Sequence, residues 1–469
     1  MKIEQIYTGC LAQGAYYIES NGEVAIVDPL REVQPYIDQA EKSGAKIKYI
    51  LETHFHADFV SGHLTLAEKT GATIVYGPQA NPKFEAHIAS DGEELKLGNV
   101  TIKVLHTPGH TMESTTYLLK DEEGEDHAIF TGDTLFLGDV GRPDLAQKAA
   151  HMTQEELAAT LYDSLRNKVM PLADDIIVYP GHGAGSACGK NMMKETVDTL
   201  GNQKKMNYAL RENMTKEEFV KEVTDGLLPP PQYFPLNVQM NKEGYDSIDD
   251  VLEKGLRKLG PDAFEAAANE TGAILLDVRH QNEFVKGFVP NSVFIGLDGS
   301  FAPWVGALIR DVKQPILLIS PEGREEEAVT RLARVGFDNV LGYLEGGVEA
   351  WNQAGKELDT MALESAEDMA TAYKQGAIIV DVRKPGEYQS EHVENAMNIP
   401  LDFLNEQMAE VPKDKSFHIH CAGGYRSVIA GSILKSRGYH DLINVEGGYK
   451  AIKETDVPKT DYVCPSTLK

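Results

Sequence analysis

The chain has 469 residues, which is too long for one hydrophobic core, so two to four domains are expected. Its formal net charge of −27 argues against nucleic acid and membrane surfaces as partners, because both are anionic. No basic segment followed by an apolar one opens the chain, and no apolar run of about 18 residues occurs, so a cytoplasmic protein is expected. Four widely separated cysteines favour free thiols over a disulfide framework: Cys10, Cys188, Cys421 and Cys464.

The first part of the chain is patterned as short strands followed by helices. The sequence predicts strands at residues 3–7, 15–18 and 24–28, and helices near residues 33–43 and 63–70. A proline-rich stretch at residues 229–231, with Pro235 after it, marks the predicted exit from this first unit.

One local design occurs four times in this unit: an apolar strand, a short turn, and then a side chain able to bind metal. The strands at residues 47–51, 100–105, 128–130 and 176–179 lead to His54 with His56, to His110, to Asp133 and to His182, respectively. Ligands that follow neighbouring strands meet at one edge of a sheet. A lone histidine would carry little weight, but four such cases predict a metal centre.

The first ligand segment, residues 53–59, reads T-H-F-H-A-D-F. It resembles the T-H-x-H-x-D motif of the metallo-β-lactamase superfamily, and the order of the later ligands agrees with that resemblance, which implies an αββα sandwich. The position after Asp58, usually a histidine, is Phe59, and a phenyl ring cannot bind a metal. One good metal site is therefore expected, which favours mononuclear chemistry, with iron as a candidate, over binuclear zinc hydrolysis.

The rest of the chain contains an internal repeat. Residues 274–279 (ILLDVR) return 104 residues later as residues 378–383 (IIVDVR), and Glu283-Phe284 returns at the same offset as Glu387-Tyr388. A later landmark, E-G-G, returns after only 101 residues, so the second copy is shorter between the landmarks. Each copy alternates strand and helix patterns, which is typical of an α/β domain with a parallel sheet.

The second copy resembles the rhodanese family. Its strand ends at residue 420, and the loop C-A-G-G-Y-R-S follows at residues 421–427, before a helix expected to start near Val428. A cysteine thiolate attacks sulfane sulfur and forms a persulfide. The loop N–H groups and the helix N-terminus should lower the thiol pKa of Cys421, and Arg426 adds a positive charge suited to thiosulfate or sulfite.

The first copy departs from that family. Its corresponding loop is S-P-E-G-R at residues 320–324, which has no cysteine and is one residue shorter. A proline, an added carboxylate and an acidic helix start replace the anion-binding character of the second copy. The first copy is therefore interpreted as a pseudo-rhodanese that serves as a spacer or docking domain.

Within its superfamily the first unit looks most like the persulfide dioxygenases, through two features. One is the run G-R-P-D at residues 141–144 shortly after T-G-D-T-L-F at residues 131–136, and the other is the pair of C-terminal repeats. The resemblance implies one Fe(II) per chain, held by His54, His110 and Asp133, with zinc as a substitute. The remaining polar residues would orient the ligands or the substrate, or would be inert vestiges of a binuclear ancestor: His56, Asp58 and His182.

Two further residues keep two interpretations each. Arg142 could bind an anionic group of the substrate, or it could form a structural salt bridge with Asp144. Cys188 lies in a glycine-rich loop six residues after His182, where it could hold or relay sulfur, or be a small buried apolar residue.

These predictions describe an α/β multidomain chain with three parts. A metallo-β-lactamase sandwich is expected in residues 1–245, a pseudo-rhodanese domain in residues 246–358 and a rhodanese domain in residues 359–469. The whole resembles the persulfide dioxygenase–rhodanese fusions of bacterial sulfide detoxification. The resemblance implies that O2 oxidises a low-molecular-weight thiol persulfide to sulfite and thiol, and that Cys421 passes sulfur to sulfite to give thiosulfate. A zinc thioester hydrolase of the glyoxalase II kind and a non-catalytic sulfur carrier are the alternatives, and the thiol carrier and a homo-oligomeric state stay open.

Overall fold

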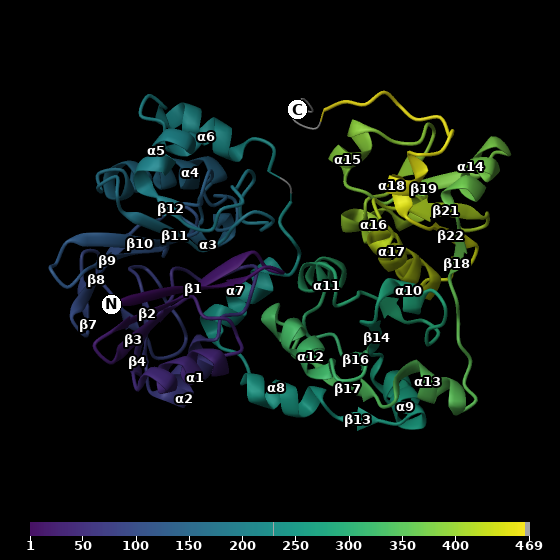
Figure 1. Ribbon diagram of the computed structural model, residues 1–469, viewed down its shortest axis with the longest axis horizontal. Coiled ribbons are helices and arrows are strands. Elements are labelled where there is room, and N and C mark those ends of the chain that lie inside the picture. The colour runs from purple at the N-terminus through teal and green to yellow at the C-terminus, as the bar shows by residue number, and fades with distance from the viewer. Residues whose placement is uncertain (228, 465–469) are drawn as a thin grey trace. The chain divides into compact units, whose positions relative to one another are not determined.

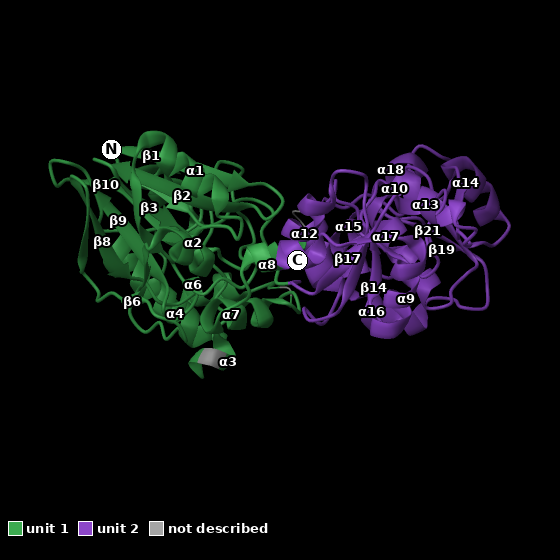
Figure 2. Ribbon diagram, turned by 90° about the horizontal axis from the view of Figure 1, so that it is seen from below, with its two compact units in different colours: residues 1–250, 332–336 green, residues 251–331, 337–469 purple. Residues whose placement is uncertain are grey.

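The computed structural model describes residues 1–227 and 229–464, and it divides into two compact units (Figure 2). Unit 1 contains residues 1–250 with 332–336, and unit 2 contains residues 251–331 with 337–469. The last five residues of the predicted third domain lie outside the described part of the chain. Within that part, no helix combines the length and the apolar character needed to cross a bilayer.

Unit 1 is built on two six-stranded sheets, as the αββα expectation requires (Figure 1). The first sheet has the order β1-β2-β3-β4-β5-β6 and the second the order β12-β11-β10-β9-β8-β7. The strands are β1 (Lys2–Thr8), β2 (Gln13–Ser20), β3 (Glu23–Val27), β4 (Lys46–Leu51), β5 (Thr73–Tyr76), β6 (His87–Ile88), β7 (Glu94–Leu97), β8 (Val100–His106), β9 (Thr115–Lys120), β10 (Asp126–Gly132), β11 (Ile177–Pro180) and β12 (Asp198–Thr199).

Strand β2 illustrates why the sheets are covered on both faces. Its side chains point alternately to opposite faces of the sheet. Tyr16 and Ile18 belong to the core between the two sheets, whereas Ala15 and Tyr17 belong to the core beneath the outer helices. The strand is therefore buried almost throughout and lacks the polar alternation of a half-exposed strand.

Helices pack on the outer faces, with α1 and α2 over the first sheet and α4 and α6 over the second. The helical segments up to residue 255 are α1 (Gln34–Ser43), α2 (His63–Thr70), α3 (Gln147–Ala150), α4 (Gln154–Ser164), a π-turn (Leu165–Val169), α5 (Leu200–Met206), a 3₁₀ turn (Tyr208–Leu210), α6 (Lys216–Thr224), α7 (Phe234–Glu243) and α8 (Ile248–Gly255).

The proline-rich stretch is not the exit from the first unit. Helix α7 follows it and still packs on unit 1, because the Asn241 side-chain amide donates hydrogen bonds of 2.8 Å to the carbonyls of His56 and Phe59. The chain passes into unit 2 only after residue 250. Proline marks a break in secondary structure, which need not be the end of a domain.

Unit 2 contains two five-stranded sheets whose paired strands all run parallel. Their orders, β13-β17-β16-β14-β15 and β18-β22-β21-β19-β20, are identical once β13 is matched with β18. The internal repeat is thus a repeated fold. The strands are β13 (Lys258–Leu259), β14 (Ile274–Asp277), β15 (Val293–Phe294), β16 (Ile316–Ile319), β17 (Val340–Leu344), β18 (Ala362–Glu364), β19 (Ile378–Asp381), β20 (Met397–Asn398), β21 (Phe417–His420) and β22 (Leu442–Val445).

Helix α17 begins at Tyr425 and not near Val428. Gly424 has a φ of 105°, and this left-handed conformation lets the chain turn directly from the Cys421 loop into the helix. The later helical segments are α9 (Pro261–Thr271), α10 (Gln281–Phe284), α11 (Phe301–Leu308), α12 (Glu325–Arg334), α13 (Gly347–Gln353), α14 (Ala366–Lys374), α15 (Pro385–Ser390), α16 (Leu404–Gln407) between 3₁₀ turns (Leu401–Phe403 and Met408–Glu410), α17 (Tyr425–Ser436) and α18 (Gly448–Ile452).

Candidate active sites

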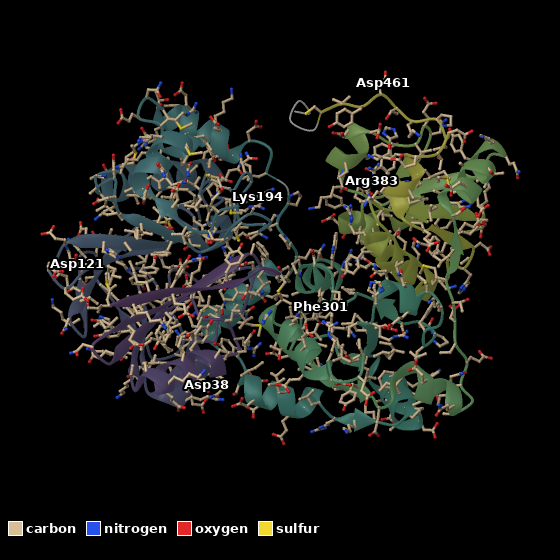
Figure 3. All side chains as sticks on the ribbon, in the orientation of Figure 1. Asp38, Asp121, Lys194, Phe301, Arg383 and Asp461 are labelled. Carbon is tan, nitrogen blue, oxygen red and sulfur yellow. The ribbon has the colours of Figure 1, made fainter. Side chains whose placement is uncertain are left out.

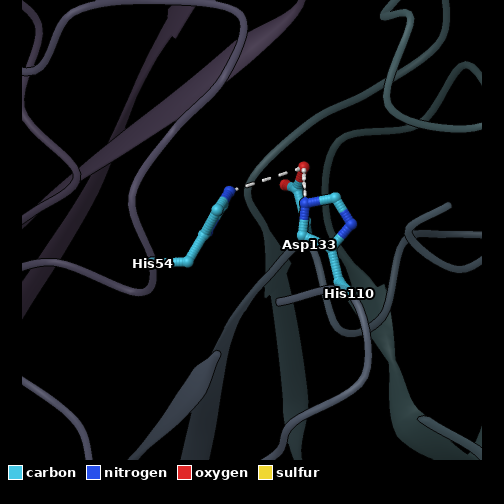
Figure 4. A group of neighbouring side chains, drawn as sticks. All are labelled: His54, His110 and Asp133. Carbon is cyan, nitrogen blue, oxygen red and sulfur yellow. Dashed lines mark ion pairs between the residues drawn. The ribbon is translucent and has the colours of Figure 1, made fainter. Parts of the chain in front are cut away.

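Three predicted ligands converge in unit 1 (Figure 4). His54, His110 and Asp133 follow β4, β8 and β10, and each is at most 2% exposed. Asp133 Oδ2 lies 3.9 Å from His54 Nε2 and 3.5 Å from His110 Nε2. Among the described residues Asp133 Oδ2 has no hydrogen-bond partner. A buried carboxylate oxygen without a donor, facing two imidazole nitrogens, fits a divalent cation bound between them.

Hydrogen bonds orient both imidazole rings for that role. His110 Nδ1 donates to the Arg142 carbonyl at 2.9 Å, because a carbonyl can only accept. His54 Nδ1 lies 3.0 Å from Thr53 Oγ1, which itself donates to Asp28 Oδ2 and so accepts from the ring. The Nε2 atoms are thereby left as lone-pair donors. Burial also lowers the pKa of His54 well below its ordinary value, which favours the neutral imidazole that a metal needs.

His182 connects this group to a second set of buried donors. Its Nδ1 lies 2.8 Å from Asp133 Oδ1 and its Nε2 lies 2.7 Å from Asp58 Oδ2. Burial alone would lower the pKa of His182, but Asp133 and Asp58 together raise it well above its ordinary value. One potential ligand atom from each of Asp58, His182 and Cys188 lies within 4.8 Å of the others. Although Phe59 cannot bind a metal, these three side chains therefore lie near the predicted metal position.

The Nε2 atom of His56 faces two buried carboxylates. This atom lies 3.1 Å from Asp28 Oδ1 and 3.6 Å from Glu52 Oε2, and the His56 ring packs on Phe59 with centroids 4.3 Å apart. Burial alone would lower the pKa of His56, but the carboxylate of Asp28 raises it to about 9. Burial also raises the pKa of Glu52 to about 8. His56 thus lies beside His54, with its Nε2 atom directed at the Asp28 carboxylate.

Sequence reasoning missed Asp28 and Glu52, although each directly follows a strand as the ligands do. Asp28 has a φ of 48°, which is unusual for a residue with a side chain. This conformation turns its carboxylate back to accept hydrogen bonds of 2.8 Å from Thr53 N and Thr53 Oγ1. Asp28 therefore fixes the segment that carries His54.

Arg142 forms the salt bridge that was one of its two predicted roles. Its Nε and Nη2 donate to the two carboxylate oxygens of Asp144, each at 2.7 Å, and Nη1 donates to the Ala187 carbonyl at 3.2 Å. Its backbone carbonyl orients His110, and its backbone N–H donates to the Cys188 carbonyl. These contacts give Arg142 a structural role beside the site, and its binding of substrate stays a prediction.

Cys188 is 1% exposed. Burial raises the pKa of its thiol well above the ordinary value, and nearby Asp58 and Asp133 raise it further. A protonated thiol is a poor nucleophile. This environment favours the structural interpretation of Cys188, and sulfur relay through it stays a hypothesis.

The second site lies in unit 2, at the loop between β21 and α17. Cys421 is 1% exposed, and Gly424 N–H donates to its sulfur at 3.1 Å. This hydrogen bond and the N-terminus of α17 both direct partial positive charge at the sulfur. Arg426 forms a bidentate pair with Glu387, with distances of 2.6 and 2.8 Å. The Arg426 charge is therefore shared with a carboxylate. The repeat pattern drew attention to Glu387 and the loop motif to Arg426, but neither revealed that the two side chains meet.

The pseudo-rhodanese copy has a different loop at the equivalent place. Ser320 Oγ donates to the Pro321 carbonyl at 3.1 Å, and Arg324 binds Glu327 and Asp298. A cavity of about 880 Å³ opens beside this loop. Its lining carries both signs of charge and includes Arg279, Lys286, Glu322, Glu325 and Glu345.

Comparison with known families assigns the first unit to one family and both copies of the repeat to another. The profile of the metallo-beta-lactamase superfamily matches residues 8–182. The profile of the rhodanese-like domain matches twice, at residues 260–354 and 365–455.

Individual proteins extend the comparison. The human mitochondrial persulfide dioxygenase ETHE1 is 30% identical over 221 residues, which cover 47% of this chain and 78% of that protein. A cytoplasmic hydroxyacylglutathione hydrolase of Arabidopsis thaliana is 35% identical over 187 residues, which cover 39% of this chain and 67% of that protein. The crystal structure of a metallo-beta-lactamase from Staphylococcus aureus subsp. aureus COL is 30% identical with a TM-score of 0.65, and the match covers 73% of this chain and 98% of that one. The chain belongs to the metallo-beta-lactamase superfamily and carries two rhodanese-like domains after its metallo-beta-lactamase domain.

Proposed function

We propose that the chain is a persulfide dioxygenase coupled to a sulfurtransferase. The observation that carries the first activity is the buried set of His54, His110 and Asp133, in which Asp133 Oδ2 has no hydrogen-bond partner among the described residues. Two imidazoles and one carboxylate are the ligand set typical of mononuclear non-haem iron oxygenases. The similarity to human ETHE1 supports the same choice.

Iron held by these residues would supply the redox chemistry by which dioxygen oxidises a sulfane sulfur. The reaction consumes one thiol persulfide, one O2 and one water, and it yields one thiol, one sulfite and two protons. The protein residues keep the donors in place. His182 holds a proton on Nδ1 toward Asp133 Oδ1, so that Oδ2 stays free to face the cation.

Cys421 would carry the second activity. Its thiolate takes a sulfane sulfur from a second persulfide molecule and becomes a cysteine persulfide, releasing the thiol. Sulfite then attacks the outer sulfur, the sulfur–sulfur bond to Cys421 breaks, and thiosulfate leaves with the thiolate restored. Because both activities belong to one chain, sulfite is produced at a high local concentration for this step.

The first experiment measures oxygen uptake by the full chain after anaerobic loading with Fe(II), using glutathione persulfide as the substrate. Oxygen uptake is expected in the wild type and should be lost in His110→Ala. The control is His87→Ala, because His87 is an exposed histidine of the same unit that pairs with Glu93. Oxygen uptake that persists in His110→Ala would contradict the proposed ligand set.

The second candidate function is zinc-dependent thioester hydrolysis, which the similarity to the Arabidopsis hydrolase and the donors Asp58, His182 and Cys188 favour. Metal content separates the two. The dioxygenase proposal predicts about one iron per chain, lost in His110→Ala and kept in Asp58→Asn. Two metals per chain, falling to one in Asp58→Asn, together with thioester hydrolysis, would favour the hydrolase.

A further inference from the structure

Helix α17, which begins in the Cys421 loop, is buried on every side. Its residues 427–434 are all buried. A helix that packs only on its own sheet keeps one polar face toward solvent. Helix α17 instead packs on β21 and β22 of its own copy and on β15 of the pseudo-rhodanese copy. The pseudo-rhodanese copy therefore covers the helix that supports the sulfur-transfer loop.

Within the described part of the chain, two hydrogen bonds join α17 to the pseudo-rhodanese copy. Near the middle of the helix, Phe294 N–H donates to Ser432 Oγ at 2.9 Å. At its first residue, the Tyr425 hydroxyl donates to the Gly296 carbonyl at 2.8 Å. The rings of Tyr425 and Phe294 also meet edge to face, with centroids 5.9 Å apart. Tyr425 lies four residues after Cys421, so the second hydrogen bond acts at the loop itself.

Gly299 of the pseudo-rhodanese copy leaves the space that the Tyr425 ring occupies. A Cβ atom added at Gly299 would lie 2.2 Å from Tyr425 Cζ, which is far shorter than any van der Waals contact. An alanine at this position would therefore displace the ring without changing any residue of the rhodanese copy.

The placement of Tyr425 bears directly on the Cys421 sulfur. Gly424 N–H donates to that sulfur, and Gly424 precedes Tyr425. A Cβ atom added at Gly423 or Gly424 would meet no atom within 4 Å, so both glycines are open on that side. The first half of the loop is held from its own copy, where Tyr449 N–H donates to the Cys421 carbonyl at 2.6 Å and Lys450 N–H to the Ala422 carbonyl at 3.0 Å. The second half, which carries Gly424, leads into Tyr425, which binds Gly296 of the pseudo-rhodanese copy.

We propose that the pseudo-rhodanese copy is a positioning domain for the sulfur-transfer loop, and that Tyr425 is the positioning residue through which it acts. Tyr425 anchored on Gly296 keeps the Gly424 N–H directed at Cys421, which stabilises the thiolate. This inference rests on the proposed role of Cys421.

The test is the pH dependence of kcat/KM for thiosulfate, measured with the full chain as it passes sulfur from thiosulfate to cyanide. Thiosulfate gives its outer sulfur to the Cys421 thiolate and releases sulfite, and cyanide then removes that sulfur as thiocyanate. The acidic limb of the profile reports the thiolate of the free enzyme. In Tyr425→Phe its midpoint should rise by about half to one pH unit, which lowers the rate below the midpoint about three- to tenfold.

Ser432→Ala is the matched control, because it removes the other hydrogen bond from the same helix to the same copy, away from the loop. Its midpoint should equal that of the wild type. Equal shifts in Tyr425→Phe and Ser432→Ala would overturn the proposal, because they would reflect a general loosening of the interface.

A second pair of variants changes only the pseudo-rhodanese copy. Gly299→Ala should raise the midpoint as Tyr425→Phe does. Gly260→Ala should not, because a Cβ at Gly260 meets no atom within 4 Å and its φ is −61°. Wild-type profiles in both Gly299→Ala and Tyr425→Phe would overturn the proposal. A wild-type chain without any transfer to cyanide would instead contradict the role of Cys421 itself.

Discussion

The two rhodanese-like copies share a fold and differ in chemistry. Each keeps a buried aspartate–arginine pair at the end of β14 or β19. The pairs are Asp277–Arg279 and Asp381–Arg383, and the closest distance between their charged atoms is 2.6 Å in both (Arg383 is labelled in Figure 3). The loops that follow β16 and β21 have diverged. Residues that hold the fold are thus separable from the loop residues proposed to handle sulfur.

The arginines of the two loops show how the divergence works. Arg426 binds Glu387 on the neighbouring α15, which holds it beside Cys421. Arg324 binds Glu327 and Asp298, and no ion pair is shown for Glu283, the counterpart of Glu387, within the described ranges. The pseudo-rhodanese copy has therefore lost the cysteine and has also turned its arginine toward other carboxylates.

The largest effect is expected from Cys421, the proposed nucleophile. Cys421→Ser should lower sulfur transfer from thiosulfate to cyanide at least about a thousandfold. Ser320→Cys, introduced into the same variant, should not restore it, because Pro321 removes one loop N–H and the added carboxylates of Glu322 and Glu325 disfavour a thiolate. Recovery of transfer in the double variant would show that the first copy lacks only its cysteine. Cys464→Ser, at an exposed cysteine, is the control.

An intermediate effect is expected from the loop arginine. Arg426→Lys should lower kcat/KM for thiosulfate about ten- to hundredfold, since lysine cannot form the bidentate pair with Glu387. The matched change in the other copy, Arg324→Lys, should leave this constant unchanged. Steady-state kinetics on both variants measures this difference in kcat/KM. Equal losses in the two variants would show that Arg324 also takes part in sulfur transfer.

The smallest effect concerns stability. Burial alone would raise the pKa of Glu387, but the hydrogen bonds from Arg426 lower it below the ordinary value. A carboxyl group whose pKa is lower in the folded state stabilises the fold above its unfolded pKa, and this contribution is lost as the pH falls through the folded value. Urea unfolding between about pH 5 and 3 should therefore show a shallower loss of stability in Glu387→Gln than in wild type. Glu283→Gln should behave like wild type, and an unchanged slope in Glu387→Gln would contradict the ion pair.

The sequence predicted features that repeat or that follow a strand. The copies at a spacing of 104 residues predicted two similar α/β folds, and the strand-then-ligand pattern brought His54, His110 and Asp133 to one place. Contacts between distant segments could not be predicted. The pairing of Arg426 with Glu387 and the hydrogen bond from Tyr425 to Gly296 depend on which loops meet in space, and neither periodicity nor motif spacing contains that information.

The same limit explains why the partners of His56 were missed, because Asp28 and Glu52 come from the ends of neighbouring strands. It also explains one difference in each unit. The proline-rich stretch was taken as a domain exit, although α7 returns to hydrogen-bond with unit 1. Helix α17 starts three residues earlier than predicted, because Gly424 adopts a positive φ that the sequence permits but does not require.

The most direct test of the two-site account follows oxygen and sulfur products together, in Fe(II)-loaded full chain supplied with glutathione persulfide. In wild type the account predicts oxygen uptake with thiosulfate as a product. In Cys421→Ser it predicts unchanged oxygen uptake, with sulfite accumulating in place of thiosulfate. No oxygen uptake by the iron-loaded wild type, or undiminished thiosulfate formation in Cys421→Ser, would contradict the account.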